Sequence, residues 1–332
     1  MHNQIDVIAT TISGSISDWG KIERIVPEFN RRGWSHVNLH SADSHAEARN
    51  ITRQLVLDGT RTLISAGGSG TFNSVLEGCI DSGAPLSQIT LGFLRKGSAD
   101  LIGKTLGMPD EIEQAIAVFV NSLEQGFTQP CDVIRITSDN NDTAGRHFVG
   151  YSGAGIFGRI PHFTENRFMK YYKGILSQLF GDLGPFFVGA ALTTGEKVLH
   201  KLVHKPEQWK IMDGNQILSR GKFQAMIIVN GDLGPDLPFA RGKSLGSGSF
   251  YLFAIRDLGI LRLPGQFRRA WNSSIQEQAE QWGFESFSIR EELVISKDDG
   301  AAFPVNVDGS TLICQPDARF RIIDQIRLIS AS

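Results

Sequence analysis

The sequence lacks the features that would place it within a membrane or on nucleic acid. Its longest apolar run, residues 185–192, is far shorter than the roughly 20 residues that a membrane-spanning helix needs. A formal net charge of −2 gives no general attraction to a polyanion. We therefore expect neither a transmembrane segment nor a nucleic-acid partner.

Cysteine is also scarce. The three cysteines, Cys79, Cys131 and Cys314, are scattered, odd in number and without metal-ligand spacing. The first residues, MHNQIDVIATT, show no basic stretch followed by an apolar one, so we expect no signal peptide. Both absences indicate a reduced, cytoplasmic setting, which still allows contact with a membrane surface.

Strand-like and helix-like patterns alternate through residues 1–129. The β-rich runs are 5–10, 34–40, 60–66 and 89–94, and the helical patterns are 17–33, 43–59, 71–83 and 109–126. Such alternation predicts parallel strands joined by crossover helices. We expect a Rossmann-like three-layer α/β domain.

The pattern changes after about residue 130. Short β-rich runs dominate, separated by turn signals such as Asp213-Gly214 and Asp308-Gly309, and interrupted by one helical pattern at 165–184. We interpret residues 130–332 as an antiparallel β-sandwich domain, with the tail from about 318 a candidate to return to the first domain. A cleft between two unlike domains would suit a substrate.

A glycine-rich turn, ISAGGSGTFNSVLEG at residues 64–78, joins a predicted strand to a predicted helix. This arrangement presents backbone N–H groups and a positive helix end to an anion. The P-loop is excluded because no lysine follows, and G-x-G-x-x-G fails at Asn73. The nucleophile elbow G-x-S-x-G fails at Thr71. The glycines could also simply allow the helix to pack closely on the sheet.

A serine hydrolase that uses Ser69 stays open at this point. An elbow enzyme also needs an acid and a downstream histidine, and His162, His200 and His204 are available. A second near-match to the elbow pattern surrounds Ser152 and fails at the same place.

The same glycine-rich stretch resembles the GGDGT-x-N-E-V-x-N-G motif of the diacylglycerol kinase catalytic domain family. That family includes bacterial lipid kinases and sphingosine kinases and is related to NAD kinases. Other segments follow in the family's order: SADSHAEAR at 41–49, LGFLRKGSADLIGKTLGMP at 91–109, and then CDVIRI, FVGYSGAGIFGRI, VNGDLG, GSFYLFAIR and VNVDGS. The resemblance spans nearly the whole chain.

The resemblance implies ATP-dependent transfer of the γ-phosphate to a lipid hydroxyl at a membrane surface, with Mg²⁺ as a further cofactor. Asp308 matches the aspartate of a terminal D-G-E motif, the implied general base, and Asp132 matches a water or metal partner. The positions that match nucleotide or phosphate contacts are Ser41, Gly67, Gly68, Ser69, Gly70, Thr71, Gly97, Ser98 and Asp100. From the residues alone, Asp308-Gly309 is also an ordinary hairpin turn, Asp132 a solvated strand end and Ser41 a helix cap.

Some family positions are changed in this sequence. Ser69 stands where the family has a catalytic aspartate, Asp100 replaces an asparagine, and Ser310 replaces the glutamate of D-G-E. A hydroxyl cannot hold Mg²⁺ as a carboxylate does. The alternative to an active kinase is therefore a catalytically weakened relative that binds lipid or nucleotide.

Residues 261–274 combine arginines with aromatic residues: Arg262, Phe267, Arg268, Arg269 and Trp271. This composition suits anionic headgroups, but we favour the interpretation as a solvated helix with an aromatic residue on its core side. The motifs do not distinguish diacylglycerol, a sphingoid base, ceramide or phosphatidylglycerol as the acceptor, and they report no oligomeric state.

Overall fold

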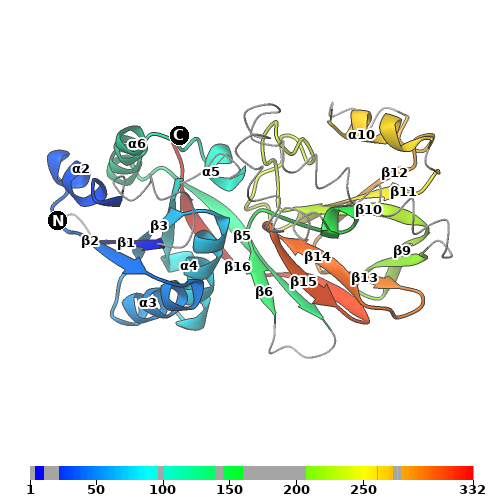
Figure 1. Ribbon diagram of the computed structural model, residues 1–332, viewed down its shortest axis with the longest axis horizontal. Coiled ribbons are helices and arrows are strands. Elements are labelled where there is room, and N and C mark those ends of the chain that lie inside the picture. Colours follow the sequence, from blue (N-terminus) through cyan, green and yellow to red (C-terminus); the bar gives the residue numbers. More distant parts are fainter. Residues whose placement is uncertain are drawn as a thin grey trace. The chain divides into compact units, whose positions relative to one another are not determined.

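The chain forms two compact units, Met1–Val133 with Asp324–Ser332, and Ile134–Ile323. The computed structural model in Figure 1 describes residues 4–10, 22–95, 101–138, 145–159, 207–259, 261–271, 275 and 278–331. The chain leaves the first unit within strand β5 (Thr128–Ser138) and returns to it within the last strand, β16 (Asp317–Ile329). The second unit is therefore inserted into the first.

The first unit is built on a parallel sheet with the strand order β2-β1-β3-β4-β16. Its first four strands are β1 (Ile5–Thr10), β2 (Val37–Ala42), β3 (Thr62–Gly67) and β4 (Thr90–Arg95). The end of β16 pairs in parallel with the start of β4, where Arg327 lies opposite Thr90. Each neighbouring pair is parallel, so the alternating pattern predicted this sheet correctly.

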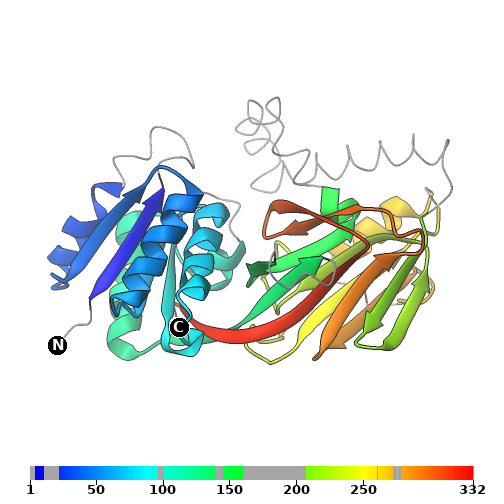
Figure 2. The same ribbon diagram turned by 90° about the horizontal axis from the view of Figure 1, so that it is seen from below.

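Helices cover both faces of this sheet and make three layers. Helices α3 (His45–Leu57) and α4 (Ser69–Asp81) lie on one face, and α2 (Ile25–Arg31) and α6 (Ile112–Gln125) lie on the other (Figure 1). Figure 2 shows α3 and α4, coloured blue to cyan, side by side in front of the strands. A short helix α5 (Leu101–Thr105) and a 3₁₀ turn (Leu86–Gln88) complete the unit.

The ends of two of these helices follow from local sequence. Ser44 caps α3 by accepting a hydrogen bond from the Glu47 N–H at 3.0 Å, while the Glu47 carboxylate accepts from the Asp43 N–H at 2.7 Å. Gly126 ends α6 in the left-handed conformation, with φ 72°. Both ends lie where the capping signals predicted them.

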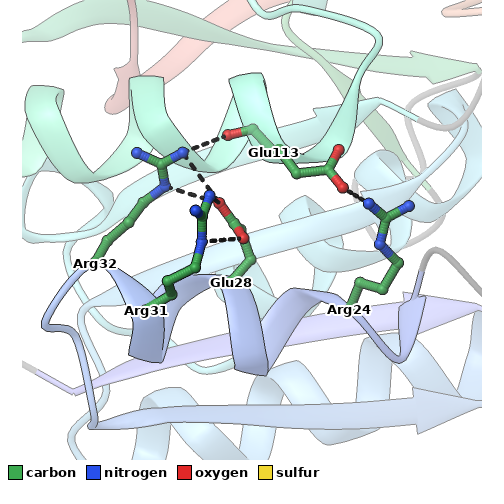
Figure 3. A network of polar contacts seen from close by, with 5 residues as sticks. All are labelled: Arg24, Glu28, Arg31, Arg32 and Glu113. Carbon is green, nitrogen blue, oxygen red and sulfur yellow. Dashed lines mark hydrogen bonds and ion pairs between the residues drawn. The ribbon is translucent and has the colours of Figure 1, made fainter.

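A network of charged side chains holds α2 against α6 (Figure 3). Arg31 and Arg32 donate hydrogen bonds to the Glu28 carboxylate, and the Arg32 guanidinium also donates to the Glu113 carbonyl at 3.2 Å. Arg24 forms an ion pair with the Glu113 carboxylate. The Arg31 guanidinium is the main reason that the pKa of Glu28 lies below its ordinary value.

The second unit is an antiparallel β-sandwich. One sheet has the order β12-β11-β10-β7-β14-β15; the facing strands follow the order β16-β13-β8-β9, with β5 pairing both β16 and β6. Their bounds are β6 (Arg146–Phe148), β7 (Tyr151–Gly155), β8 (Trp209–Asp213), β9 (Gln216–Gly221), β10 (Phe223–Val229), β11 (Phe250–Arg256), β12 (Phe284–Ile289), β13 (Glu292–Lys297), β14 (Phe303–Val307) and β15 (Ser310–Cys314). Helix α10 (Leu263–Trp271) follows β11.

The core of this unit lies between its two sheets. Phe148, Trp209 and Phe320 from one sheet pack with Phe250 and Phe303 from the other, all of them buried. The short β-rich runs separated by turn signals therefore predicted the sandwich correctly. The predicted helix at 165–184 lies outside the described residues. No helix in the described part of the chain is long and apolar enough to cross a membrane.

Candidate functional site

The glycine-rich turn links β3 to α4 as the sequence predicted. Strand β3 ends at Gly67, Gly68 occupies the N-cap with an extended backbone, and α4 begins at Ser69. No described side chain caps the helix, and its first internal bond runs from the Phe72 N–H to the Gly68 carbonyl at 3.1 Å. The N–H groups of Ser69 and Gly70 thus lie in the first turn, at the positive end of the helix. This geometry suits an anion.

The glycines of this turn are required for different reasons. A Cβ on Gly67 would lie 2.3 Å from the Thr71 hydroxyl oxygen, so close packing of α4 on the sheet explains this glycine. A Cβ on Gly68 would meet no atom within 4 Å, and its φ of −92° suits any residue. The close-packing interpretation therefore accounts for Gly67 and leaves Gly68 without an explanation inside the protein.

Thr71 fixes the start of α4 against the end of β1. Its hydroxyl oxygen lies 2.6 Å from the hydroxyl oxygen of Thr10, and both residues are buried. A buried hydroxyl pair of this kind makes the turn rigid. The Thr71 side chain thus positions the turn.

Ser69 is exposed, and its backbone is helical. A nucleophile elbow holds its serine in a strained turn, whereas the non-glycine residues with positive φ in the described ranges are Ala240, Gln278 and Asp308. Ser152 is buried, and its hydroxyl donates to the Asn306 carbonyl at 2.6 Å. Neither serine has the geometry of an elbow nucleophile. The candidate partners His162, His200 and His204 lie outside the described residues.

Ser41 lies in β2, exposed and opposite Ala9 of β1. The interpretation of Ser41 as a helix cap is wrong, because Ser44 caps α3. Gly97, Ser98 and Asp100 lie outside the described residues.

One residue beside the glycine turn was not singled out from the sequence. The His45 ring lies over Gly70, so that a Cβ on Gly70 would be 2.8 Å from His45 Nε2. His45 opens α3, and crossover helices of a parallel sheet begin at the same edge, where ligands bind. The position of His45 directly after Ser44, at the start of a predicted helix, was the signal in the sequence that could have identified it.

Asp308 occupies the turn between β14 and β15, in the second unit. It is buried, with a left-handed φ of 42°. Its carboxylate accepts hydrogen bonds from the N–H groups of Tyr151, Val149 and Gly150 at 2.7, 3.3 and 3.4 Å. The Asp308 N–H donates in turn to the Tyr151 carbonyl at 2.9 Å. Asp308 therefore joins its own turn to the connection between β6 and β7.

Burial raises the pKa of the Asp308 carboxyl to about 6, although the three N–H donors act in the opposite direction. A carboxylate whose pKa lies near neutrality is a suitable proton acceptor. A left-handed conformation at a residue other than glycine is also more frequent at functional sites. The Asp-Gly pair is a hairpin turn, as the local pattern suggested, but its carboxylate is not solvated.

Asp132 is buried in β5 and accepts a hydrogen bond from the Gln325 amide at 2.8 Å. The interpretation of Asp132 as a solvated strand end is therefore wrong. Nowhere in the described ranges do three His, Cys, Asp or Glu side chains gather where they could hold a metal ion.

Comparison with known proteins relates the first part of the chain to a family of kinases. Residues 4–136 match the diacylglycerol kinase catalytic domain model. The chain is 22% identical to the diacylglycerol kinase of Bacillus subtilis (strain 168) over 241 residues, which cover 72% of this chain and 69% of that protein.

Solved structures share the fold at low identity. A diacylglycerol kinase from Bacillus anthracis str. Sterne superposes with a TM-score of 0.63 at 14% identity, over 99% of this chain and 97% of that one. An NAD kinase from Archaeoglobus fulgidus, solved in complex with ATP, gives a TM-score of 0.53 at 9% identity, over 99% and 94% of the two chains. The glycine-rich turn lies within residues 4–136, the part of the chain that matches the diacylglycerol kinase catalytic domain model.

Proposed function

We propose that this protein is a lipid kinase that transfers the γ-phosphate of ATP to a lipid hydroxyl. The observation that carries the proposal is the open turn at Gly68. A Cβ on Gly68 would meet no described atom within 4 Å, and the residue leads directly into the first turn of α4, which no described side chain caps. A phosphate needs this combination of close backbone approach and converging N–H donors. The match of residues 4–136 to the diacylglycerol kinase catalytic domain model, and the fold shared with an NAD kinase solved in complex with ATP, support ATP as the nucleotide.

The described residues would have separate roles in phosphate binding and proton transfer. The N–H groups of Ser69 and Gly70 bind phosphate oxygens, and the His45 ring borders the same position. Asp308 accepts the proton of the lipid hydroxyl while that oxygen forms its bond to the γ-phosphorus, and ADP leaves with the electron pair of the broken bond. By resemblance, Ser41, Gly97, Ser98 and Asp100 complete the nucleotide site.

Mg²⁺ is the metal expected with ATP, and it would neutralise charge on the phosphates. The described acidic side chains do not gather into a site for it, so we assign it no residue beyond Asp132, which the resemblance implies. We further infer that residues 1–129 bind the nucleotide and residues 130–332 the lipid.

The competing proposal is a weakened relative, because exposed Ser69 replaces the family's aspartate. Transfer of labelled γ-phosphate from ATP should be measured with diacylglycerol, a sphingoid base, ceramide and phosphatidylglycerol, for the wild type, Ser69→Asp and Ser69→Ala. If Ser69→Asp impairs an active wild type, the protein is a kinase adapted to serine. If Ser69→Asp creates activity in an inactive protein, the weakened relative is correct.

Absence of transfer to every lipid by both the wild type and Ser69→Asp would contradict the kinase proposal. Ser69→Ala is the matched control, because it removes the hydroxyl and adds no charge. Covalent labelling of Ser69 by a serine-directed phosphonate would instead support a hydrolase, and we expect none.

A further inference from the structure

Exposed leucines and arginines lie on residues 258–269 of the second unit, a segment that packs on Trp282 through Arg262 and Arg269. We call this surface the Trp282 patch, and it consists of Leu258, Leu261, Arg262, Arg268, Arg269 and Trp282. Leu261 is 94% exposed and Leu258 is 40% exposed. Large aliphatic side chains are seldom left this open to water beside one another. They precede and begin the turn that leads into α10.

The indole of Trp282 holds two of the arginines. The guanidinium groups of Arg262 and Arg269 lie 5.4 and 4.5 Å from the centre of its ring. Gly265, between them on the same helical face, allows this approach, because a Cβ there would lie 2.5 Å from the indole. Cation–π contact thus keeps the two charges on one side of the helix.

Helix α10 is fixed in place by a buried amide. The Gln266 amide nitrogen donates to the carbonyl oxygens of Arg256 and Trp282 at 2.9 and 2.8 Å. Its amide oxygen accepts from Gln224 at 2.6 Å. The patch is therefore preformed, and binding there would not require α10 to be ordered first.

Two of the three arginines carry charges that no acidic side chain in the described ranges neutralises. Residues 258–271 contain three arginines and no acidic residue. Arg262 and Arg268 are exposed and form no ion pair with any residue in the described ranges. A surface complementary to this face must supply anions for guanidinium groups and an apolar layer for leucines. An anionic lipid bilayer supplies both, phosphates at the headgroups and acyl chains directly beneath.

We propose that the Trp282 patch docks the protein on an anionic membrane, with Leu261 entering the acyl boundary and the arginines binding lipid phosphates. The inference rests on the proposed function, since a kinase with a lipid acceptor must work at an interface. It proposes headgroup contact for residues 261–274, where the sequence alone favoured a solvated helix. The side chains of Phe267 and Trp271 lie outside the described residues and carry no part of it.

Sedimentation of the full chain with vesicles tests the proposal. We expect binding to vesicles of phosphatidylcholine mixed with phosphatidylglycerol, weak binding to phosphatidylcholine alone, and a loss of binding at high salt. Arg268→Ala should lower the partition constant about fivefold. Leu261→Asp should lower it about tenfold or more. The matched controls Arg290→Ala and Ile313→Asp alter an exposed arginine and a 61% exposed isoleucine elsewhere in the unit, and should bind as the wild type does.

Equal losses in the test and control variants would overturn the assignment to this patch. Failure of the wild type to prefer anionic vesicles would overturn membrane docking and favour an acidic protein as the occupant. Transfer of phosphate by the wild type to a monomeric short-chain diacylglycerol, measured without vesicles, separates the two proposals. Vesicle binding without any transfer would leave the docking patch standing and remove the proposed function.

Discussion

The buried carboxylate of Asp308 can be tested by Asp308→Asn. Asparagine tolerates the left-handed φ of 42° better than most residues, and its carbonyl oxygen can still accept a hydrogen bond from the Tyr151 N–H. The amide cannot ionise. The substitution therefore removes the charge while it keeps the backbone conformation and the strongest contact.

The size of the effect follows from the pKa of Asp308, which burial raises from 3.8 to about 6. That difference is about 2 pH units, and each unit corresponds to about 1.4 kcal/mol. Between these two values the native state keeps a proton that the unfolded state has released. The free energy of unfolding of the wild type should thus fall by about 3 kcal/mol as pH rises from about 4 to about 6, and then level off.

Urea unfolding followed by tryptophan fluorescence, repeated from acid to neutral pH, measures this change in the free energy of unfolding. Trp209 reports on it because this residue lies in the core of the same unit. The difference in unfolding free energy between wild type and Asp308→Asn should shift by about 3 kcal/mol in favour of the variant across that range. Parallel stability profiles for the two proteins would refute a carboxylate that is buried and raised in pKa.

The same variant separates a catalytic Asp308 from one that only joins two turns. A general base at this position predicts a loss of transfer activity of about 10²- to 10⁴-fold in Asp308→Asn. It also predicts a wild-type rate that rises with pH through about 6 and then becomes constant, because the ionised carboxylate accepts the proton. An active variant with an unchanged pH profile would leave Asp308 a structural role.

The remaining predictions concern the glycine turn and the α2–α6 network. Gly67→Ala should lower the free energy of unfolding by about 1–3 kcal/mol in thermal denaturation, because the new Cβ would lie 2.3 Å from the Thr71 hydroxyl oxygen. Gly68→Ala should change the free energy of unfolding by less than about 1 kcal/mol. It should weaken ATP binding, measured by calorimetry, about tenfold or more. An unchanged affinity for ATP would contradict a phosphate-binding loop at Gly68. Thr71→Val should cost about 1–2 kcal/mol, since it removes the buried hydrogen bond between the hydroxyl groups of Thr71 and Thr10. Glu28→Gln should lower the melting temperature at neutral pH. The pKa of Glu28 is lowered in the folded protein, so the ionised carboxylate stabilises the fold above the ordinary carboxyl pKa. This stabilisation is lost as pH falls through the pKa of the folded state, and the melting temperatures of wild type and Glu28→Gln should therefore converge in acid. A difference in melting temperature that stays constant with pH would argue against the ion pairs.

The sequence predicted those parts of the molecule whose signals are local. Periodicity located the strands β1 to β4 and the helices α3, α4 and α6, whereas the short helix α5 was not predicted. The glycine turn was recognised from its position between a strand and a helix. The burial of Asp308 could not be predicted, because the N–H of Tyr151 that it binds comes from 157 positions away in the chain. The contact of His45 with Gly70 likewise depends on how α3 packs against α4. Pairwise packing of distant segments leaves no signature in a single segment.

The inserted arrangement of the two units has a consequence for synthesis on the ribosome. Strand β4 receives its last neighbour when β16 pairs with Thr90 and Leu91, and Ser122 receives a carbonyl partner from Ser330. All of Ile134–Ile323 must be translated first, which takes roughly 10–40 s at ordinary elongation rates. During that interval the nascent α/β domain carries an unpaired sheet edge, a hazard for aggregation and a binding site for chaperones. A premature stop near the C-terminus would therefore damage the glycine-rich turn's own domain rather than the sandwich translated just before it.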